Sequence, residues 1–181
     1  TFDGAADLGA STYKNGNVSE IRWQNDLDDE QVYVYNYDEL DRLTEADYFN
    51  VDDVTKNDSR NVDVVYDDNG NIESLKRDTE GGLLDDLLYE YRGNQLDKVT
   101  DYSLNTQGFA DGADHAAEYE YDANGNLVRD DNKGITNIAY NALNLVERVT
   151  FGPDQYIEFT YDAAGLKLTK SVKNGNQDPV V

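Results

Sequence analysis

Apolar and polar residues alternate along short stretches of the chain, and many of these stretches end in a tyrosine. From Gln31 to Tyr37 three tyrosines alternate with residues that include two valines, and from Glu118 to Tyr121 two tyrosines alternate with two glutamates. A period of two places successive side chains on opposite faces of a strand, so that one face is buried. The pattern therefore predicts an all-β fold of antiparallel strands.

One phrase follows each of these tyrosines: a polar residue, two or three spacers, Gly or Asn, and then an aliphatic residue. The clearest copies run from Tyr66 to Ile72 and from Tyr121 to Leu127. Recurrence every few tens of residues is typical of a repeat array. We therefore interpret residues 1–181 as one continuous segment of about seven β-hairpins. The seven tyrosines that begin the copies, called anchor tyrosines below, are Tyr13, Tyr37, Tyr66, Tyr91, Tyr121, Tyr140 and Tyr161.

The residues after each anchor tyrosine predict how the chain reverses. In Asn69-Gly70 and Asn124-Gly125 both residues tolerate the positive φ that a tight hairpin requires. Beyond the turn, apolar residues recur three positions apart, as at Ile72 and Leu75. This offset breaks strict alternation and predicts a β-bulge in the second strand.

Three other segments need separate interpretation. Leucines cluster between Gly82 and Tyr91, but the flanking tyrosines favour a strand over a helix. Asp52–Asn61 and Ser103–Ala117 lack sustained periodicity and predict longer loops. With so few helix signals, we expect helix to stay below roughly a fifth of the residues.

Composition narrows the functional classes. The chain has 38 acidic and 15 basic residues, a net charge of −23, which argues against nucleic acid as a partner. The charge suits protection of exposed strand edges, a saline setting or a cation-binding surface, and composition does not separate these. There is no cysteine, and no long apolar run for membrane insertion by this segment. Because the chain lacks methionine and begins at Thr1, we interpret it as a piece of a longer protein.

Few residues qualify as catalytic or metal-binding groups. His115 lies in a polar loop without a partner that would make it a general base, so we expect it to be exposed. Acidic clusters at Asp26–Glu30, Asp52–Asp58 and Asp67–Asn71 offer the oxygen ligands that calcium takes. In Asp67–Asn71, however, glycine stands two positions before the place that a calcium loop requires, which favours a hairpin turn.

Two further features carry weaker signals. Trp23, the only tryptophan, is predicted to lie at the edge of the core, with carbohydrate stacking as the alternative. Asn17-Val18-Ser19 and Asn57-Asp58-Ser59 match the glycosylation acceptor pattern, which often arises by chance. We therefore assign no catalytic, cofactor-binding or metal-binding residue and expect no cofactor.

The phrase from Tyr119 to Leu127 resembles the RHS repeat, also called the YD repeat, and the resemblance covers essentially the whole chain. The segments 13–23 and 132–141 are similar to YD-repeat proteins of Bacteroidetes, which are large surface or secreted chains. The resemblance implies a curved or spiralling strip of β-hairpins that forms part of a hollow shell. In toxin complexes such a shell encloses a C-terminal toxic domain, and in teneurins it belongs to an adhesion receptor.

Two functions follow from this resemblance. The first is a non-enzymatic structural segment of a secreted or cell-surface assembly, such as a shell, fibre or adhesive appendage. The alternative is the wall of a cage that delivers a C-terminal toxin. Toxin-type relatives carry Asp-Pro-Gly near a self-cleavage site, whereas here Asp178-Pro179 lacks the glycine, so no catalytic residue is carried over. The expected partners are the rest of its own chain, further copies in a homo-oligomer or filament, a target-cell surface or an enclosed toxin.

Overall fold

The structure, a computed structural model, describes residues 8–25, 30–51, 59–113, 115–175 and 180. Strands account for 54% of the residues, and no helix occurs in this described part. The strands form antiparallel hairpins, which confirms the predicted all-β class and the expected scarcity of helix.

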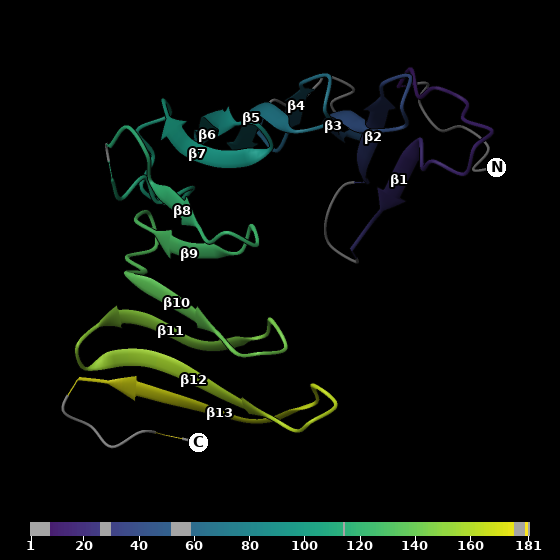
Figure 1. The fold of residues 1–181 in the computed structure, drawn as a ribbon. Coiled ribbons are helices and arrows are strands. Elements are labelled where there is room, and N and C mark those ends of the chain that lie inside the picture. Colours follow the sequence, from purple (N-terminus) through teal and green to yellow (C-terminus); the bar gives the residue numbers. More distant parts are fainter. Residues whose placement is uncertain (1–7, 26–29, 52–58, 114, 176–179, 181) are drawn as a thin grey trace. The chain divides into compact units, whose positions relative to one another are not determined.

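Thirteen strands occur in the described part of the chain, and Figure 1 traces them in order. Seven form one sheet in the order β1 to β7, two pair as β8-β9, and four form a sheet in the order β10 to β13. The chain divides into two compact units: unit 1 contains residues 1–89 and 100–109, and unit 2 contains residues 90–99 and 110–181. The strands are β1 (Glu20–Trp23), β2 (Gln31–Tyr37), β3 (Leu43–Asn50), β4 (Val62–Tyr66), β5 (Ile72–Thr79), β6 (Gly82–Arg92), β7 (Gln95–Asp101), β8 (Tyr119–Tyr121), β9 (Leu127–Asp130), β10 (Asn137–Tyr140), β11 (Val146–Gly152), β12 (Gln155–Tyr161) and β13 (Lys167–Asn174).

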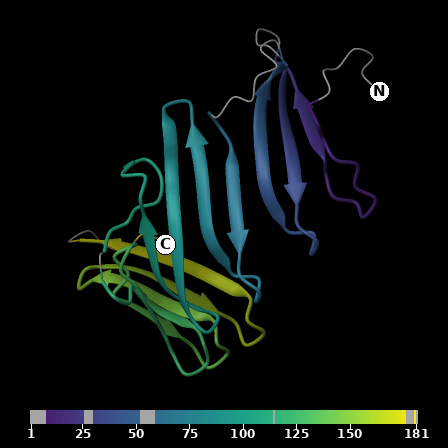
Figure 2. The ribbon, with the colours of Figure 1, turned by 90° about the horizontal axis from the view of Figure 1, so that it is seen from above.

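In unit 1 the strands run alternately up and down, as Figure 2 shows for β1 to β5. Both faces of β2 are covered: Val32 and Val34 are buried on one face, and the tyrosines are half-buried on the other. On the tyrosine face Tyr33 pairs across the sheet with Tyr48, which is itself buried. Broad aromatic rings therefore supply much of the buried area where aliphatic residues are few.

In unit 2 one face of the β10–β13 sheet carries a cross-strand row of aliphatic residues. Ile138 pairs with Val149, Val149 with Ile157, and Ile157 with Val172. The exposed fraction is 9% at Ile138 and rises to 38% at Val172 on the outermost strand. The row is therefore well covered at β10 and open toward β13.

The predicted bulges are confirmed. In five hairpins, the anchor tyrosine and the residue before it pair with two residues that lie two positions apart in the second strand. One extra residue of the second strand therefore lies between these two partners. This extra residue restores Ile72 and Leu75 to the same face, which explains their three-residue spacing. The extra residues are Thr44, Glu73, Val128, Glu147 and Leu168.

Two other predictions are confirmed and one is wrong. The segment Gly82–Arg92 is strand β6, and no strand occurs among the described residues between Asp101 and Tyr119. Tyr13, however, belongs to no strand: bends at 14–16 lead to β1, so the first copy contributes only its second strand. Most of Asp52–Asn61 lies outside the described residues.

Candidate functional site: repeat turns and tyrosine contacts

The residue after the anchor tyrosine organises each five-residue turn, called a repeat turn below. In the turn at Asp67, one carboxylate oxygen accepts the backbone N–H groups of Asn69 at 2.9 Å and Asn71 at 2.8 Å. The second oxygen accepts the side-chain amide of Asn71 at 2.8 Å. An Asp side chain that accepts N–H groups from the residues just after it is the Asx-turn arrangement. The polar residue of the sequence phrase is thus a local backbone acceptor.

The same arrangement recurs in the other long repeat turns. Asp122 accepts the N–H groups of Asn124 and Asn126 at 2.9 Å each, and the Asn126 side chain at 2.9 Å. Asn141 does the same with its amide oxygen toward Leu143 and Leu145, so a negative charge is not essential. Asp38 and Asp162 begin the two remaining long repeat turns.

The backbone of the repeat turns corrects one prediction. Gly70 and Gly125 have φ values of 90° and 85°, as expected, but Asn69 and Asn124 do not have positive φ. The N–H of Gly70 donates to the carbonyl of Asp67 at 3.1 Å, so the Asn precedes a single left-handed residue. This agrees with a type I turn followed by a left-handed residue, and not with a two-residue turn that needs two of them. Asp41 and Asn144 hold the left-handed position in their turns.

Hydrogen bonding within the turns lowers the pKa values of the carboxylates. The Asn71 side chain, followed by backbone N–H groups, holds the pKa of Asp67 below its ordinary value, and Asn126 does the same for Asp122. For Asp38 the backbone N–H of Arg42 is the largest cause. The hairpin interpretation of Asp67–Asn71 is therefore confirmed, because both carboxylate oxygens of Asp67 accept hydrogen bonds within the turn. No group of three or more potential metal ligands occurs in the described residues.

The anchor tyrosines join each hairpin to the one before it. Tyr66 donates its hydroxyl to the backbone carbonyl of Leu43 at 2.9 Å, and Leu43 is the first residue of the second strand of the preceding hairpin. We call this bond the tyrosine contact. It recurs at three further joints, where Tyr37 donates to Val18 at 3.0 Å, Tyr140 to Leu127 at 2.7 Å, and Tyr161 to Val146 at 2.7 Å.

Burial favours the donor form of these phenols. Desolvation raises the pKa of Tyr140 above the ordinary value for tyrosine. A phenol with a raised pKa keeps its proton at neutral pH and can donate it to a carbonyl. Tyr140 therefore keeps the proton that it donates to the Leu127 carbonyl.

Polar side chains also join neighbouring repeat turns. Asn126 and Asn144 exchange amide hydrogen bonds of 2.7 Å and 3.0 Å. The guanidinium of Arg42 lies 4.5 Å from the centre of the Tyr66 ring and donates to the carbonyl of Asp67 at 3.3 Å. Each of these turns is therefore fixed both internally and against its neighbour.

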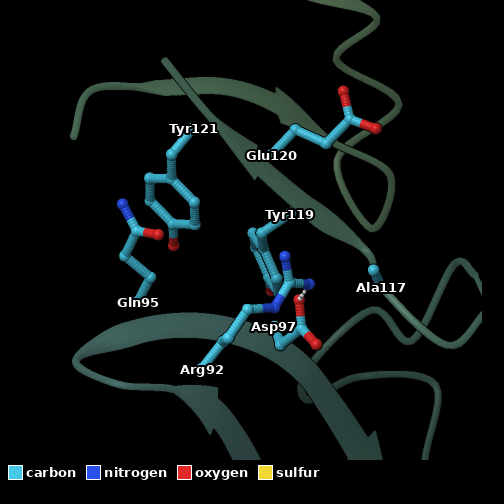
Figure 3. Close-up of a pocket in the computed structure, with 7 residues that line it drawn as sticks. All are labelled: Arg92, Gln95, Asp97, Ala117, Tyr119, Glu120 and Tyr121. Carbon is cyan, nitrogen blue, oxygen red and sulfur yellow. Dashed lines mark hydrogen bonds and ion pairs between the residues drawn. The ribbon is translucent and has the colours of Figure 1, made fainter. Parts of the chain in front are cut away.

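Unit 2 contains a hollow of about 250 Å³ beside β7 and β8, shown in Figure 3. An ion pair between Arg92 and Asp97 lies next to Tyr119, and the Tyr121 ring lies beside Gln95. Burial raises the pKa of both tyrosines, so they retain their protons. The hollow therefore presents hydrogen-bonding groups and a neutralised ion pair. Its lining is Arg92, Gln95, Asp97, Ala117, Tyr119, Glu120 and Tyr121.

The residues considered from sequence as possible sites do not converge. His115 is exposed in the 102–118 segment, as expected. Trp23 is half-buried and stacks on Tyr33 with ring centres 5.7 Å apart, which agrees with a position at the edge of the core. Asn17 is half-buried beside the first bends, where its N–H donates to Asn15. Outside the described residues lie most of the first acidic cluster (Asp26–Asp29) and all of the second (Asp52–Asp58). The second glycosylation pattern begins at Asn57-Asp58, which also lie outside them.

Sequence reasoning missed a set of buried carboxylates. Glu118 is 0% exposed, and one of its oxygens accepts the Val99 N–H at 3.1 Å and the Asn132 amide at 2.7 Å. Asp85 is also 0% exposed, pairs with Arg77 at 2.5 Å and accepts the Phe109 N–H at 2.5 Å. A third, Asp130, is 1% exposed. Of the three, only Glu118 stands between apolar residues in the sequence, a weak signal in so acidic a chain.

Known proteins were compared with this chain by sequence and by structure. No family model matches the chain, and no curated protein matches it. Among solved structures, the chain is similar to a mutant Tc holotoxin pore of Photorhabdus luminescens, with 15% identity and a TM-score of 0.38. The match covers 81% of this chain but 10% of that one, so this chain spans about a tenth of the matched protein's length. Within the described residues, no helix is both long and apolar enough to cross a bilayer.

Proposed function

We propose that this chain is a non-enzymatic structural segment of RHS, or YD, type within a large secreted or cell-surface assembly. The observation that carries the proposal is the tyrosine contact, which joins successive hairpins at four joints through the same pair of positions. A bond repeated at equivalent positions lets further hairpins be added in the same geometry, as repeat proteins require. Its role is to form a wall.

The polar groups support a structural role over a catalytic one. Carboxylates in the repeat turns accept hydrogen bonds from their own backbone, and the buried Asp85 and Glu118 accept N–H groups from other segments. A general acid or base needs instead a free, positioned group that faces a substrate. The hollow beside Tyr121 contains an Arg92–Asp97 ion pair and protonated phenols, which suit binding better than proton transfer.

Imaging the native particle tests this function. We would purify the full-length protein that contains this segment from its own cells and determine its structure by cryo-electron microscopy. We expect the segment to lie in a continuous wall or fibre of hairpins, with tyrosine contacts at each joint. A wall that encloses a separate C-terminal domain would favour the toxin cage. A segment that stands alone next to a bound substrate would contradict the proposal.

Cell fractionation gives an independent check on location. We expect the full-length protein in the medium or at the cell surface, where externally added protease cleaves it in intact cells. A cytoplasmic marker protein that remains uncleaved in the same sample is the control. Protection of the full-length protein until the cells are lysed would contradict an extracellular role.

A further inference from the structure

The outer edge of β13 differs from the rest of the chain in charge and exposure. Three of the chain's 15 basic residues, Lys167, Lys170 and Lys173, lie in this eight-residue strand. Lys167 and Lys170 are exposed, and Leu168 between them is 60% exposed. In a protein of net charge −23, this strand therefore forms a basic edge with apolar side chains still uncovered.

Part of this edge already pairs with another residue. Val172 and Val180 exchange two backbone hydrogen bonds, of 2.8 Å and 2.9 Å, as an antiparallel bridge. Lys170 lies two residues before Val172, so its N–H and C=O point to the same side of β13, away from β12. The bridge therefore fixes a direction and a register in which a longer strand would pair with Lys170.

The other joints show what such a strand carries. At three of them, the residue three positions after the acceptor of the tyrosine contact has a partner on the next hairpin, and the anchor tyrosine lies four residues after that partner. The pairs are Ile21 with Tyr33 for Tyr37, Ala46 with Val62 for Tyr66, and Val149 with Ile157 for Tyr161. At β9 and β10 the interval is five, where a turn at 131–134 joins the strands directly.

Charge pairing at an equivalent joint indicates the sign of the partner. Between β5 and β6, Lys76 forms an ion pair with Asp86 at 3.1 Å, and Arg77 forms one with Asp85 at 2.5 Å. There too a second strand presents cations and the next hairpin supplies carboxylates. Opposite charges on paired strands stabilise the pairing, so the basic β13 edge selects an acidic strand.

We infer that the β13 edge is a binding site for an acidic, tyrosine-led β-strand, which pairs with Lys170 and donates a tyrosine hydroxyl to the carbonyl of Lys167. This inference rests on the proposed function, because it applies the tyrosine contact to one more joint. The binding mode is strand addition, in which backbone hydrogen bonds give affinity and side chains give selectivity.

The test supplies such a strand in a defined register. A copy of residues 117–130 is joined directly after Val181, so that its first residue falls opposite Lys170 and the copy of Tyr121 falls four residues later. We expect amide hydrogen exchange at Lys170 to slow at least about tenfold relative to the unextended chain, since backbone pairing protects an exposed amide. The exchange rate of each backbone amide is measured by NMR.

Two matched variants make the test specific. With the copied tyrosine changed as Tyr121→Phe, the protection of Lys170 should fall by about fivefold, the loss of one hydrogen bond. With one glycine inserted before the copy, every side chain moves to the other face and the copied tyrosine no longer reaches Lys167, so the protection should fall by a similar factor. Equal protection in all three proteins, or none in any of them, would overturn the inference.

Two further outcomes separate this inference from the proposed function. Protection of Lys170 that rises with the concentration of the unextended chain would show that a second copy covers the edge, and would overturn the assigned partner. An unprotected Lys170 in the extended chain, together with a continuous hairpin wall in the native particle, would remove this inference and leave the proposed function intact.

Discussion

The repeat turns and the residues around the 102–118 segment both contain many carboxylates but use them differently. In the repeat turn at Asp67, the carboxylate accepts hydrogen bonds from residues two and four positions later. By contrast, the buried Asp85 accepts the N–H of Phe109, 24 residues away, and the buried Glu118 accepts that of Val99, 19 residues away. The local acceptors are repeated because the turns are alike, whereas the distant ones satisfy backbone that no repeated strand pairs.

This difference separates the backbone groups that the repeated turns satisfy from those that need an acceptor found at one place only. A buried N–H without an acceptor costs about 1–3 kcal/mol, so an irregular segment that packs against a sheet must find acceptors of its own. Gly108 illustrates how closely this segment approaches, because a Cβ there would collide with the Asp85 side chain and the Leu84 carbonyl.

The largest effect should follow from removing a buried acceptor. Asp85→Ala leaves the part-buried Phe109 N–H without its acceptor and removes the ion pair with Arg77, and we expect it to lower the free energy of unfolding by about 2–3 kcal/mol. The measurement is denaturant unfolding followed by circular dichroism. The control is Asp86→Ala, which removes a partly exposed ion pair with Lys76 and should cost about 0.5 kcal/mol. Equal losses in both variants would show that Asp85 has no special role.

A repeat turn should respond through its backbone conformation. Gly125 has a φ of 85°, so Gly125→Ala should lower the free energy of unfolding by about 1 kcal/mol, since a Cβ is unfavourable there. Asn124 does not have positive φ, so Asn124→Ala in the same turn should change the stability by no more than a few tenths of a kcal/mol. A larger effect at Asn124 than at Gly125 would favour the two-residue turn that the structure excludes.

The tyrosine contact should contribute a similar or slightly smaller amount. Tyr66→Phe keeps the ring under Arg42 but removes the hydroxyl that donates to Leu43, with an expected cost of about 1 kcal/mol. Tyr102, which is 61% exposed, provides the control, since Tyr102→Phe should have almost no effect. Thermal unfolding of both variants under one set of conditions decides the matter. No difference between them would mean that the contact contributes nothing to stability.

The smallest effect concerns pH. The pKa of Asp67 and that of Asp122 are lowered in the folded chain, so their contribution to stability is present above the unfolded value, about 3.9. It is lost as the pH falls through the lower folded value. Asp67→Asn should keep the turn, as Asn141 does, yet weaken the loss of stability between about pH 5 and pH 2. An unchanged pH profile in this variant would contradict the assigned hydrogen bonding.

Much of the fold could be predicted because it depends on local rules. Alternation in residues 31–37 predicts β2, and the three-residue offset from Ile72 to Leu75 predicts the bulge that the structure shows. The turn was only partly predicted, because Asn and Gly both tolerate positive φ and the sequence alone does not show which of them uses it. The prediction that Tyr13 ends a strand was wrong, because no alternating stretch of residues precedes it.

The contacts between distant residues could not be predicted from the phrase. The partner of the Tyr66 hydroxyl is a backbone carbonyl, which has no signature in the side-chain pattern. Glu118 resembles the other glutamates of the chain until the structure brings Val99 and Asn132 to it. The sequence near each anchor tyrosine therefore predicts the hairpin itself, whereas the contacts that join neighbouring hairpins depend on tertiary structure.

The tyrosine contact can be observed directly by NMR of the hydroxyl protons. Hydrogen-bonded phenol protons exchange slowly with water, and each should show a cross-peak to its acceptor residue. We expect resolved hydroxyl resonances for Tyr37, Tyr66 and Tyr161, with cross-peaks to Val18, Leu43 and Val146. Hydroxyl protons at these positions that exchange as fast as that of the exposed Tyr102 would contradict this expectation.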